Sequence, residues 1–224
     1  MARSFVHEAR RRGLGSRRDR VGPIVARLAV EHADATIALA FTNELELLIS
    51  VMLSAQTTDT NVNRVTGPLF RKYRRPEDYL AVPAEELEHD LYATGFYRQK
   101  TRSVRGAMRV LLEEFGGVVP RRVEELLRLP GVARKTANVV AAELGEVQGV
   151  VVDTHVRRLA QRLGLTTNED PVRIERDLVR LVPRANWARL PHLLIWHGRR
   201  VCDARRPACE RCVLTDLCPA SRVG

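Results

Sequence analysis

Residues 129–140, which read LPGVARKTANVV, constrain the fold more than any other part of the chain. In Pro130-Gly131 the proline fixes φ and the glycine admits positive φ, which is typical of a tight turn. From Arg134 onward the apolar residues recur with a helical period, and Pro120 opens another helical run before the turn. The sequence therefore predicts a helix, a compact turn and a second helix, whose unpaired backbone N–H groups form a ready site for a phosphate.

Lys135 lies in the first turn of that second helix. The chain has 37 lysine and arginine residues, but its only lysines are Lys72, Lys100 and Lys135. A solvated positive charge in this chain is therefore usually arginine, which, unlike lysine, cannot lose its proton and act as an amine nucleophile. Two interpretations stay open from the residues alone: Lys135 is a nucleophile, or it is an ordinary lysine on a helix surface.

The charge of the chain points to an anionic partner. With 224 residues it can form one large domain or two small ones, and its net charge is +10 with a pI of about 10.3. Such a positive net charge favours nucleic acid as the partner, and the alternative is a basic surface with no particular partner. No apolar run is long enough for a membrane span, and no apolar segment follows the N-terminal arginines as in a secretory signal. We therefore expect a cytoplasmic, nucleoid-associated protein with no membrane partner.

Helical periodicity dominates the chain, and we predict an all-α fold. Residues 147–152 form a short apolar run that is either a single strand or a buried connector. Residues 1–20 carry seven arginines and predict a mobile basic arm that touches phosphates or remains a solvated tail. The expected helices span residues 22–32, 44–55, 60–73, 83–94, 99–115, 153–163, 171–182 and 187–201.

Three features between and at the ends of these helices have competing interpretations. The polar residues 54–59 end a strongly apolar helix, where Thr58 or Asp59 is a candidate N-cap of the next one. Phe96 and Tyr97 follow a glycine turn and predict either a wedge between stacked bases or ordinary core aromatics. Asp153, 18 positions after Lys135, is either the N-cap of a helix or a catalytic carboxylate.

Four cysteines near the C-terminus predict a metal site. Cys202, Cys209, Cys212 and Cys218 have the spacing C-x6-C-x2-C-x5-C, and a cytosolic chain favours metal binding over disulfides. Four close thiolates can hold one tetrahedral metal or one iron–sulfur cluster. Zinc sites more often use two short C-x2-4-C pairs, and only one such pair is present, which favours iron–sulfur. Several arginines in the same loops can also present positive charge to DNA.

Taken together, these motifs resemble the endonuclease III family of helix-hairpin-helix DNA glycosylases. The resemblance runs from about residue 22 to 218 and rests on LSAQTTDTNVN (53–63), GFYRQK (95–100), LPGVARKTANVV, VDTHVRRLAQRLG (152–164) and the cysteine spacing. It implies two all-α lobes with a DNA cleft between them. One is a six-helix barrel lobe of residues 37–147 that includes the helix-hairpin-helix, and the other is an iron–sulfur lobe of residues 21–36 and 148–224.

The resemblance also implies an activity and its residues. The family members are bifunctional DNA glycosylases and abasic-site lyases, which remove oxidised pyrimidines from duplex DNA through a lysine Schiff base and β-elimination. By resemblance, Lys135 is the nucleophile and Asp153 the essential carboxylate, and we expect a monomer. Gln56 fills the gap left by the extruded base, and Phe96 matches a leucine that wedges into the opposite strand. The resemblance implies that the hairpin contacts DNA through Gly131, Val132, Ala133 and Arg134. It also implies that a [4Fe–4S] cluster is held by Cys202, Cys209, Cys212 and Cys218.

Two departures from the family pattern concern substrate range. Ala133 stands where the hairpin usually has a second glycine, and its methyl group predicts weaker phosphate binding. Phe96 is larger than the usual wedge. Three rival functions stay open: a related adenine glycosylase, a non-catalytic iron–sulfur DNA-binding protein and a zinc-bound DNA adaptor. The first is disfavoured because Ser50 stands where that family has a catalytic glutamate.

Overall fold

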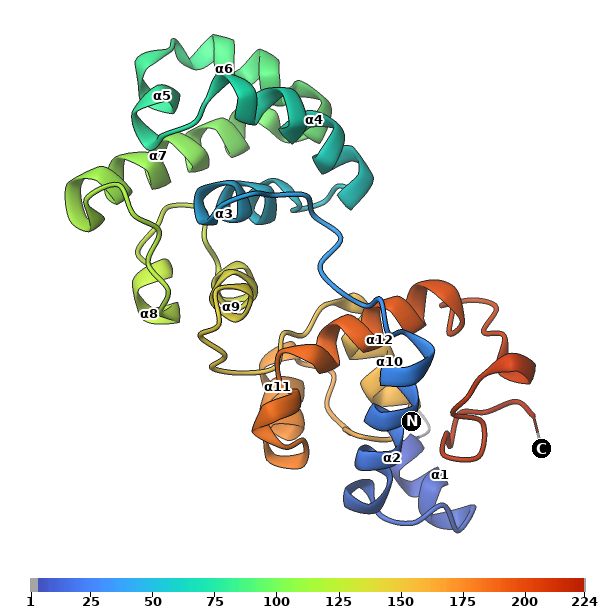
Figure 1. The fold of residues 1–224 in the computed structure, drawn as a ribbon. Helices are drawn as coiled ribbons and strands as arrows, with labels where there is room; N and C mark the ends of the chain where they lie inside the picture. Colours follow the sequence, from blue (N-terminus) through green and yellow to red (C-terminus); the bar gives the residue numbers. More distant parts are fainter. Residues whose placement is uncertain (1–3, 224) are drawn as a thin grey trace. The chain divides into compact units, whose positions relative to one another are not determined.

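The computed structural model describes residues 4–223, which form two compact helical units (Figure 1). The hairpin unit is Ala38–Gln148, and the cysteine unit is built from the described residues before 38 and after 148. No strand occurs among residues 4–223, so the prediction of an all-α chain is confirmed and residues 147–152 are a connector. None of the described helices has the length and apolar content needed to cross a lipid bilayer.

The hairpin unit is assembled around one buried helix. Every residue of α3 from Leu47 to Leu53 is buried, as expected for a helix that is apolar on nearly all sides. Asn43 caps α3, and the Thr58 hydroxyl caps α4 by accepting from the Asn61 N–H, so Thr58 rather than Asp59 is the N-cap. The helices of this unit are α3 (Glu44–Leu53), α4 (Asp59–Lys72), α5 (Pro76–Ala81), α6 (Ala84–Leu91), η1 (Tyr92–Thr94), α7 (Tyr97–Phe115), α8 (Val123–Leu126) and α9 (Arg134–Glu143).

The cysteine unit joins the N-terminal helices to the C-terminal part of the chain. The buried apolar residues of α2, α10, α11 and α12 form one core, against which three of the four cysteines pack. Thus segments more than a hundred positions apart in the sequence share one core. The helices are α1 (Phe5–Arg11), α2 (Arg17–Glu31), α10 (Thr154–Arg162), α11 (Pro171–Leu181), η2 (Arg184–Asn186), α12 (Arg189–Arg200) and η3 (Cys209–Arg211).

The predicted mobile arm of residues 1–20 is wrong for the residues that the structure describes. Residues 5–11 form α1, and α2 begins at Arg17 rather than Gly22 because Ser16 and Asp19 form a capping box. Arg20 is only 2% exposed, and its guanidinium donates to the carbonyls of the 163–164 segment and of Leu217. Its charge is therefore used inside the protein. Residues 1–3 of the predicted arm lie outside the described part.

Candidate functional site

The predicted hairpin is present as α8, a turn and α9, and the two helices pack against each other. Val132 N donates to Leu129 O at 3.0 Å, and Gly131 between them has φ of 80°. This hydrogen bond with a positive φ at the third residue matches a type II turn, in which proline commonly precedes the glycine. Leu129 and Val132 are buried and anchor the turn, whereas Gly131 is exposed. The helix before the turn begins at Val123, later than Pro120 suggested.

The N-terminus of α9 has no side-chain cap. Its N-cap residue is Ala133, whose side chain has no acceptor for the N–H groups of the first turn. Ala133 has φ of −83° and ψ of 167°, an extended conformation that alanine adopts without strain. Replacing the family glycine therefore costs the backbone nothing here. The methyl group can therefore affect only the binding of a ligand, such as a phosphate, at this exposed position.

The three lysines of the chain have three different environments. Lys72 pairs with Asp90 at 2.7 Å and Glu86 at 2.8 Å, and these contacts raise its pKa. Lys100 is only 6% exposed, its Nζ donates to Thr94 O at 2.8 Å, and burial lowers its pKa. Lys135, the second residue of α9, is exposed, and its side chain makes no hydrogen bond or ion pair with residues 4–223. Lys135 is thus the one lysine among them whose amine is neither buried nor paired.

A pocket in the hairpin unit brings together three of the predicted DNA-contact residues. Gln56 after α3, Phe96 before α7 and Gly131 in the hairpin turn line a pocket of about 260 Å³. Gln56 and Phe96 have φ of 56° and 50°, and no other non-glycine residue in the described chain has a positive φ. A left-handed conformation at such residues costs roughly 1–2 kcal/mol each and tends to occur at functional sites.

Phe96 is a surface residue. Its side chain is 66% exposed, so the alternative prediction of a core aromatic is wrong for this position. Tyr97 is half-buried and packs on Tyr92 with the ring centroids 5.0 Å apart. Lys100 also lines the pocket, and its contact with Thr94 O lies directly before the Gly95-Phe96 turn. Lys100 was not among the predicted site residues, although the rarity of lysine beside 34 arginines was a signal that could have pointed to it.

Asp153 is the N-cap of α10. Its Oδ1 accepts from Val156 N at 2.7 Å, so the first of its two interpretations is confirmed. A cap of this kind uses one carboxylate oxygen and leaves the charge of the group in place. The catalytic interpretation is therefore compatible with the cap. Asp153 belongs to the cysteine unit and Lys135 to the hairpin unit.

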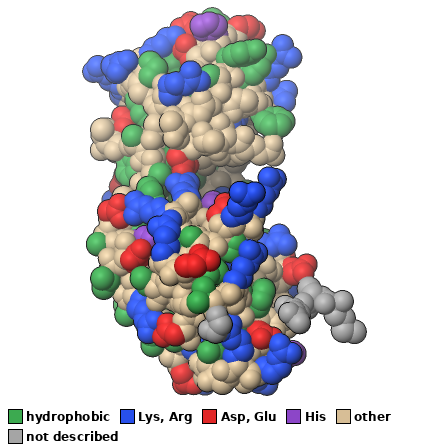
Figure 2. Space-filling model, turned by 90° about the vertical axis from the view of Figure 1, so that its right-hand side faces the viewer, with side chains coloured by type: hydrophobic (Ala, Val, Ile, Leu, Met, Phe, Trp, Pro, Cys, Tyr) green, Lys and Arg blue, Asp and Glu red, His purple; other side chains and the backbone are tan. Residues whose placement is uncertain are grey.

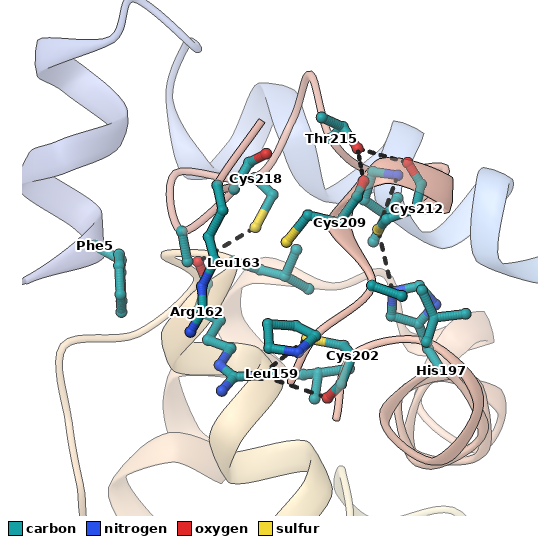
Figure 3. Close-up of a pocket in the computed structure, with 17 residues that line it drawn as sticks. Phe5, Leu159, Arg162, Leu163, His197, Cys202, Cys209, Cys212, Thr215 and Cys218 are labelled. Carbon is teal, nitrogen blue, oxygen red and sulfur yellow. Dashed lines mark hydrogen bonds between the residues drawn. The ribbon is translucent and has the colours of Figure 1, made fainter. Parts of the chain in front are cut away.

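The four cysteines surround one pocket of about 210 Å³ in the cysteine unit (Figure 3). Cys202 follows α12, Cys209 begins η3, Cys212 follows η3, and Cys218 lies near the C-terminus. Yet no three His, Cys, Asp or Glu side chains within residues 4–223 are placed to hold a single metal ion. All four cysteines nevertheless line the same pocket, as the ligands of one iron–sulfur cluster would.

Hydrogen-bond donors lie beside the sulfurs of Cys202 and Cys212. Arg162 Nη1 lies 3.3 Å from Cys202 Sγ, and Leu214 N lies 3.4 Å from Cys212 Sγ. His197 Nε2 lies 3.5 Å from Cys212 Sγ (Figure 3). Its Nδ1 lies 3.0 Å from His32 Nε2. Such donors stabilise thiolates and tune an iron–sulfur cluster. The prediction from the sequence missed both histidines.

Burial in this pocket disfavours charged side chains. Burial lowers the pKa of His197 to about 4, with the charge of His32 as a lesser cause, so the ring is neutral near pH 7. If His197 Nε2–H donates to Cys212, its Nδ1 must accept from His32. Burial, with the neighbouring sulfurs, raises the pKa of Cys218 to about 11. Four thiolates would therefore need the positive charge of iron to coexist here.

Basic side chains also lie outside this pocket. Figure 2 shows Lys and Arg side chains recurring over the visible face, with Asp and Glu among them. Beside the cysteines, Arg200 forms a bidentate pair with Asp34 and stacks on Trp196, 4.2 Å from the ring centroid. Not every arginine of the cysteine loops is therefore free to meet an anion.

Comparisons with known proteins identify the family. Residues 49–184 match the model of the HhH-GPD superfamily base excision DNA repair protein, and residues 202–218 match the iron-sulfur binding domain of endonuclease III. Endonuclease III of Synechocystis sp. is 47% identical over 94% of this chain and 97% of its own length. Endonuclease III of Bacillus subtilis is 48% identical over 82% of this chain and 84% of its own length.

Solved structures agree with these relatives. A non-covalent endonuclease III–DNA complex superposes with a TM-score of 0.87, at 41% identity, over 91% of this chain and 96% of that one. A trapped covalent intermediate of endonuclease III with DNA gives the same values. The second matched domain begins at Cys202 and ends at Cys218, so the cofactor of this chain is a [4Fe–4S] cluster. The chain belongs to the endonuclease III family of HhH-GPD superfamily base excision DNA repair proteins.

Proposed function

We propose that this chain removes oxidised pyrimidines from duplex DNA and then cuts the strand at the abasic site, with Lys135 as the nucleophile. By its family, the chain is a base excision repair DNA glycosylase with abasic-site lyase activity; the proposal concerns its substrate and its residues. The observation that carries it is the state of the three lysines. Only Lys135 has an exposed amine without a partner among the described residues, and the hairpin holds it at the start of α9.

DNA binding begins with the phosphates. The uncapped N-terminus of α9 offers backbone N–H groups to a phosphate, and Arg134 adds a cationic side chain next to them. The endonuclease III relatives that were solved with DNA support this partner. Because the one chain carries both Lys135 and Asp153, a monomer has the full set of proposed catalytic groups.

Base extrusion is assigned to the pocket of the hairpin unit. Flipping a nucleotide out of the stack costs a few kcal/mol, less for a damaged base that stacks poorly. Phe96 is exposed and held in a left-handed conformation, so its ring can enter the opposite strand. Gln56, which lines the same pocket, is proposed to fill the gap left by the base.

The chemistry is assigned to Lys135 and Asp153. The Lys135 amine attacks C1′ and the bond to the base breaks, while the Asp153 carboxylate stabilises the positive charge that develops on the sugar. Ring opening gives a Schiff base between Nζ and C1′. Loss of a proton from C2′ then expels the 3′ phosphate by β-elimination, and hydrolysis of the Schiff base frees the lysine.

The cysteine pocket is assigned to holding the cluster. When bound, the [4Fe–4S] group supplies positive charge that lets the four thiolates coexist, and it fixes the loop between Cys202 and Cys218. We assign it no part in the sugar chemistry. Cys202, Cys209, Cys212 and Cys218 would be its ligands, and Arg162 and His197 would donate hydrogen bonds to two of the sulfurs.

Borohydride trapping tests the proposal. A duplex with thymine glycol and a duplex with an abasic site are each incubated with the enzyme and borohydride, which reduces a Schiff base to a stable amine adduct. We expect an adduct on both duplexes. Lys135→Arg should abolish both adducts while keeping the positive charge, and Lys72→Arg should retain them, because it removes an amine that is already paired.

The outcomes separate the parts of the proposal. Trapping by Lys135→Arg at the wild-type level would overturn Lys135 as the nucleophile. An adduct on the abasic duplex alone would overturn removal of oxidised pyrimidines, and the base pocket around Phe96 would then be the place to look. Tight binding with no adduct on either duplex would favour a non-catalytic DNA-binding protein.

A further inference from the structure

The short helix α1, with Arg12 after it, lies against the cysteine pocket. Phe5 lines that pocket together with residues of α10, α12 and the cysteine loops, and Figure 3 shows it at one side of the four cysteines. We propose that α1 and Arg12 are a cover of the iron–sulfur site, which retains the cluster by limiting the access of solvent and solutes to it. The inference rests on the cluster lying in this pocket.

The first observation is the close packing of α1 on the end of α10. Ala9 of α1 is 1% exposed, and α1 contacts α10. A Cβ atom at Gly164, just after α10, would lie 2.8 Å from Phe5 O and 3.1 Å from Pro219 Cγ. The start of α1, the end of α10 and the loop after Cys218 therefore meet without a gap. This contact holds the backbone of Phe5 beside the pocket that its side chain lines.

The second observation is the set of hydrogen bonds from Arg12. Its Nη1 lies 3.3 Å from Cys218 O, 3.4 Å from Pro219 O and 3.5 Å from Ser221 O. One guanidinium nitrogen thus faces three carbonyl oxygens of the loop that carries the last cysteine. Ser221 N also donates to Cys218 O at 3.0 Å and closes this loop into a turn. Arg12 therefore ties α1 to the backbone of the proposed ligand Cys218.

These contacts predict how the cluster is lost. Release of iron requires that a competing ligand reach the cluster or that a cysteine swing away from it. Phe5 limits the first route and Arg12 limits the second. Removing either side chain should speed the release of iron without touching the hairpin, Lys135 or Asp153.

The test follows iron release from the whole holoenzyme. Wild type, Phe5→Ala and Arg12→Ala are incubated without oxygen with an excess of a chromogenic iron chelator, and both the chelator complex and the visible absorbance of the cluster are recorded. We expect at least about fivefold faster release from Arg12→Ala, the factor that loss of one hydrogen bond of ordinary strength produces. Release from Phe5→Ala should also be faster than from wild type. Both should still cross-link to the abasic duplex when freshly prepared.

Two matched controls exclude other causes. Arg11→Ala removes the same charge one position earlier, where the side chain is exposed and, within residues 4–223, pairs only with Glu8. Asp170→Ala removes the N-cap of α11 and weakens the same unit away from the pocket. Both should release iron at the wild-type rate.

The cover is overturned if Phe5→Ala and Arg12→Ala release iron no faster than wild type. It is also overturned if they release it only as fast as Asp170→Ala, because general loss of stability would then explain the effect. A wild-type protein that contains no iron would overturn the cluster assignment and the cover together. Failure of trapping by the wild type, with the release rates as expected, would instead overturn the proposed function alone.

Discussion

Gly131→Ala should disrupt the hairpin, for two separate reasons that the structure lets us estimate. The residue has φ of 80°, which alanine adopts only at a cost of about 1–2 kcal/mol. Its Cβ would also lie 2.4 Å from Ser103 Cβ and 2.6 Å from Ser103 Oγ, well inside van der Waals contact. Ser103 is on α7, so the clash would push the hairpin turn away from the long helix of its unit.

The cost of the positive φ and the cost of the Ser103 clash together give the expected loss of stability. Overpacking of this kind typically costs 1–3 kcal/mol, so the sum is about 2–5 kcal/mol of the free energy of unfolding. For a chain of this size, 1 kcal/mol lowers the thermal midpoint by roughly 2–4 °C, which predicts a midpoint lower by about 4–20 °C. Because the turn also positions the start of α9, we expect DNA affinity to fall as well.

The assay is thermal unfolding of the holoenzyme followed by circular dichroism at a fixed scan rate. Gly145→Ala is the matched control: Gly145 has φ of 88°, but a Cβ there would meet no atom within 4 Å. Gly145→Ala should lower the thermal midpoint by roughly 2–8 °C, the effect of the positive φ without a steric clash. The double variant Gly131→Ala/Ser103→Gly should recover much of the difference between the two. Equal midpoints for the two single variants would refute the argument from the Ser103 contact.

Three further predictions concern other parts of the site. Asp153→Asn should abolish most of the turnover yet leave the thermal midpoint within about 2 °C of wild type, because asparagine is an equally good N-cap. Asp153→Ala should also lower the midpoint by about 2–4 °C. Equal turnover for Asp153→Asn and wild type would count against a catalytic role of the carboxylate charge. Phe96→Ala should lower turnover on a thymine glycol duplex about tenfold while the midpoint changes little, since the side chain is 66% exposed; a stability loss comparable to the activity loss would contradict a wedge. Cys209→Ser should reduce bound iron and visible absorbance in the purified protein, and an unchanged iron content would remove Cys209 from the proposed ligands.

Much of the local structure follows from the sequence alone. The hairpin was predictable because Pro130-Gly131 and the helical period after Arg134 act within a few residues, and the N-cap role of Asp153 rests on equally local hydrogen bonds. The cysteine spacing likewise predicted a metal site without knowledge of the fold. Local patterns failed at the N-terminus, where seven arginines suggested a solvated arm. There the capping box of Ser16 and Asp19 was a signal that the prediction overlooked.

The sequence by itself determined which segments are helical and which residue types carry chemistry, since these depend on neighbours along the chain. Only the tertiary structure decided which polar groups are used up inside the protein. It pairs Lys72, buries Lys100 and leaves Lys135 without a partner among the described residues. Chain-distant packing likewise brought α1 to the cysteines. The physical reason is that burial and pairing depend on contacts between segments far apart in sequence, which no local period or spacing encodes.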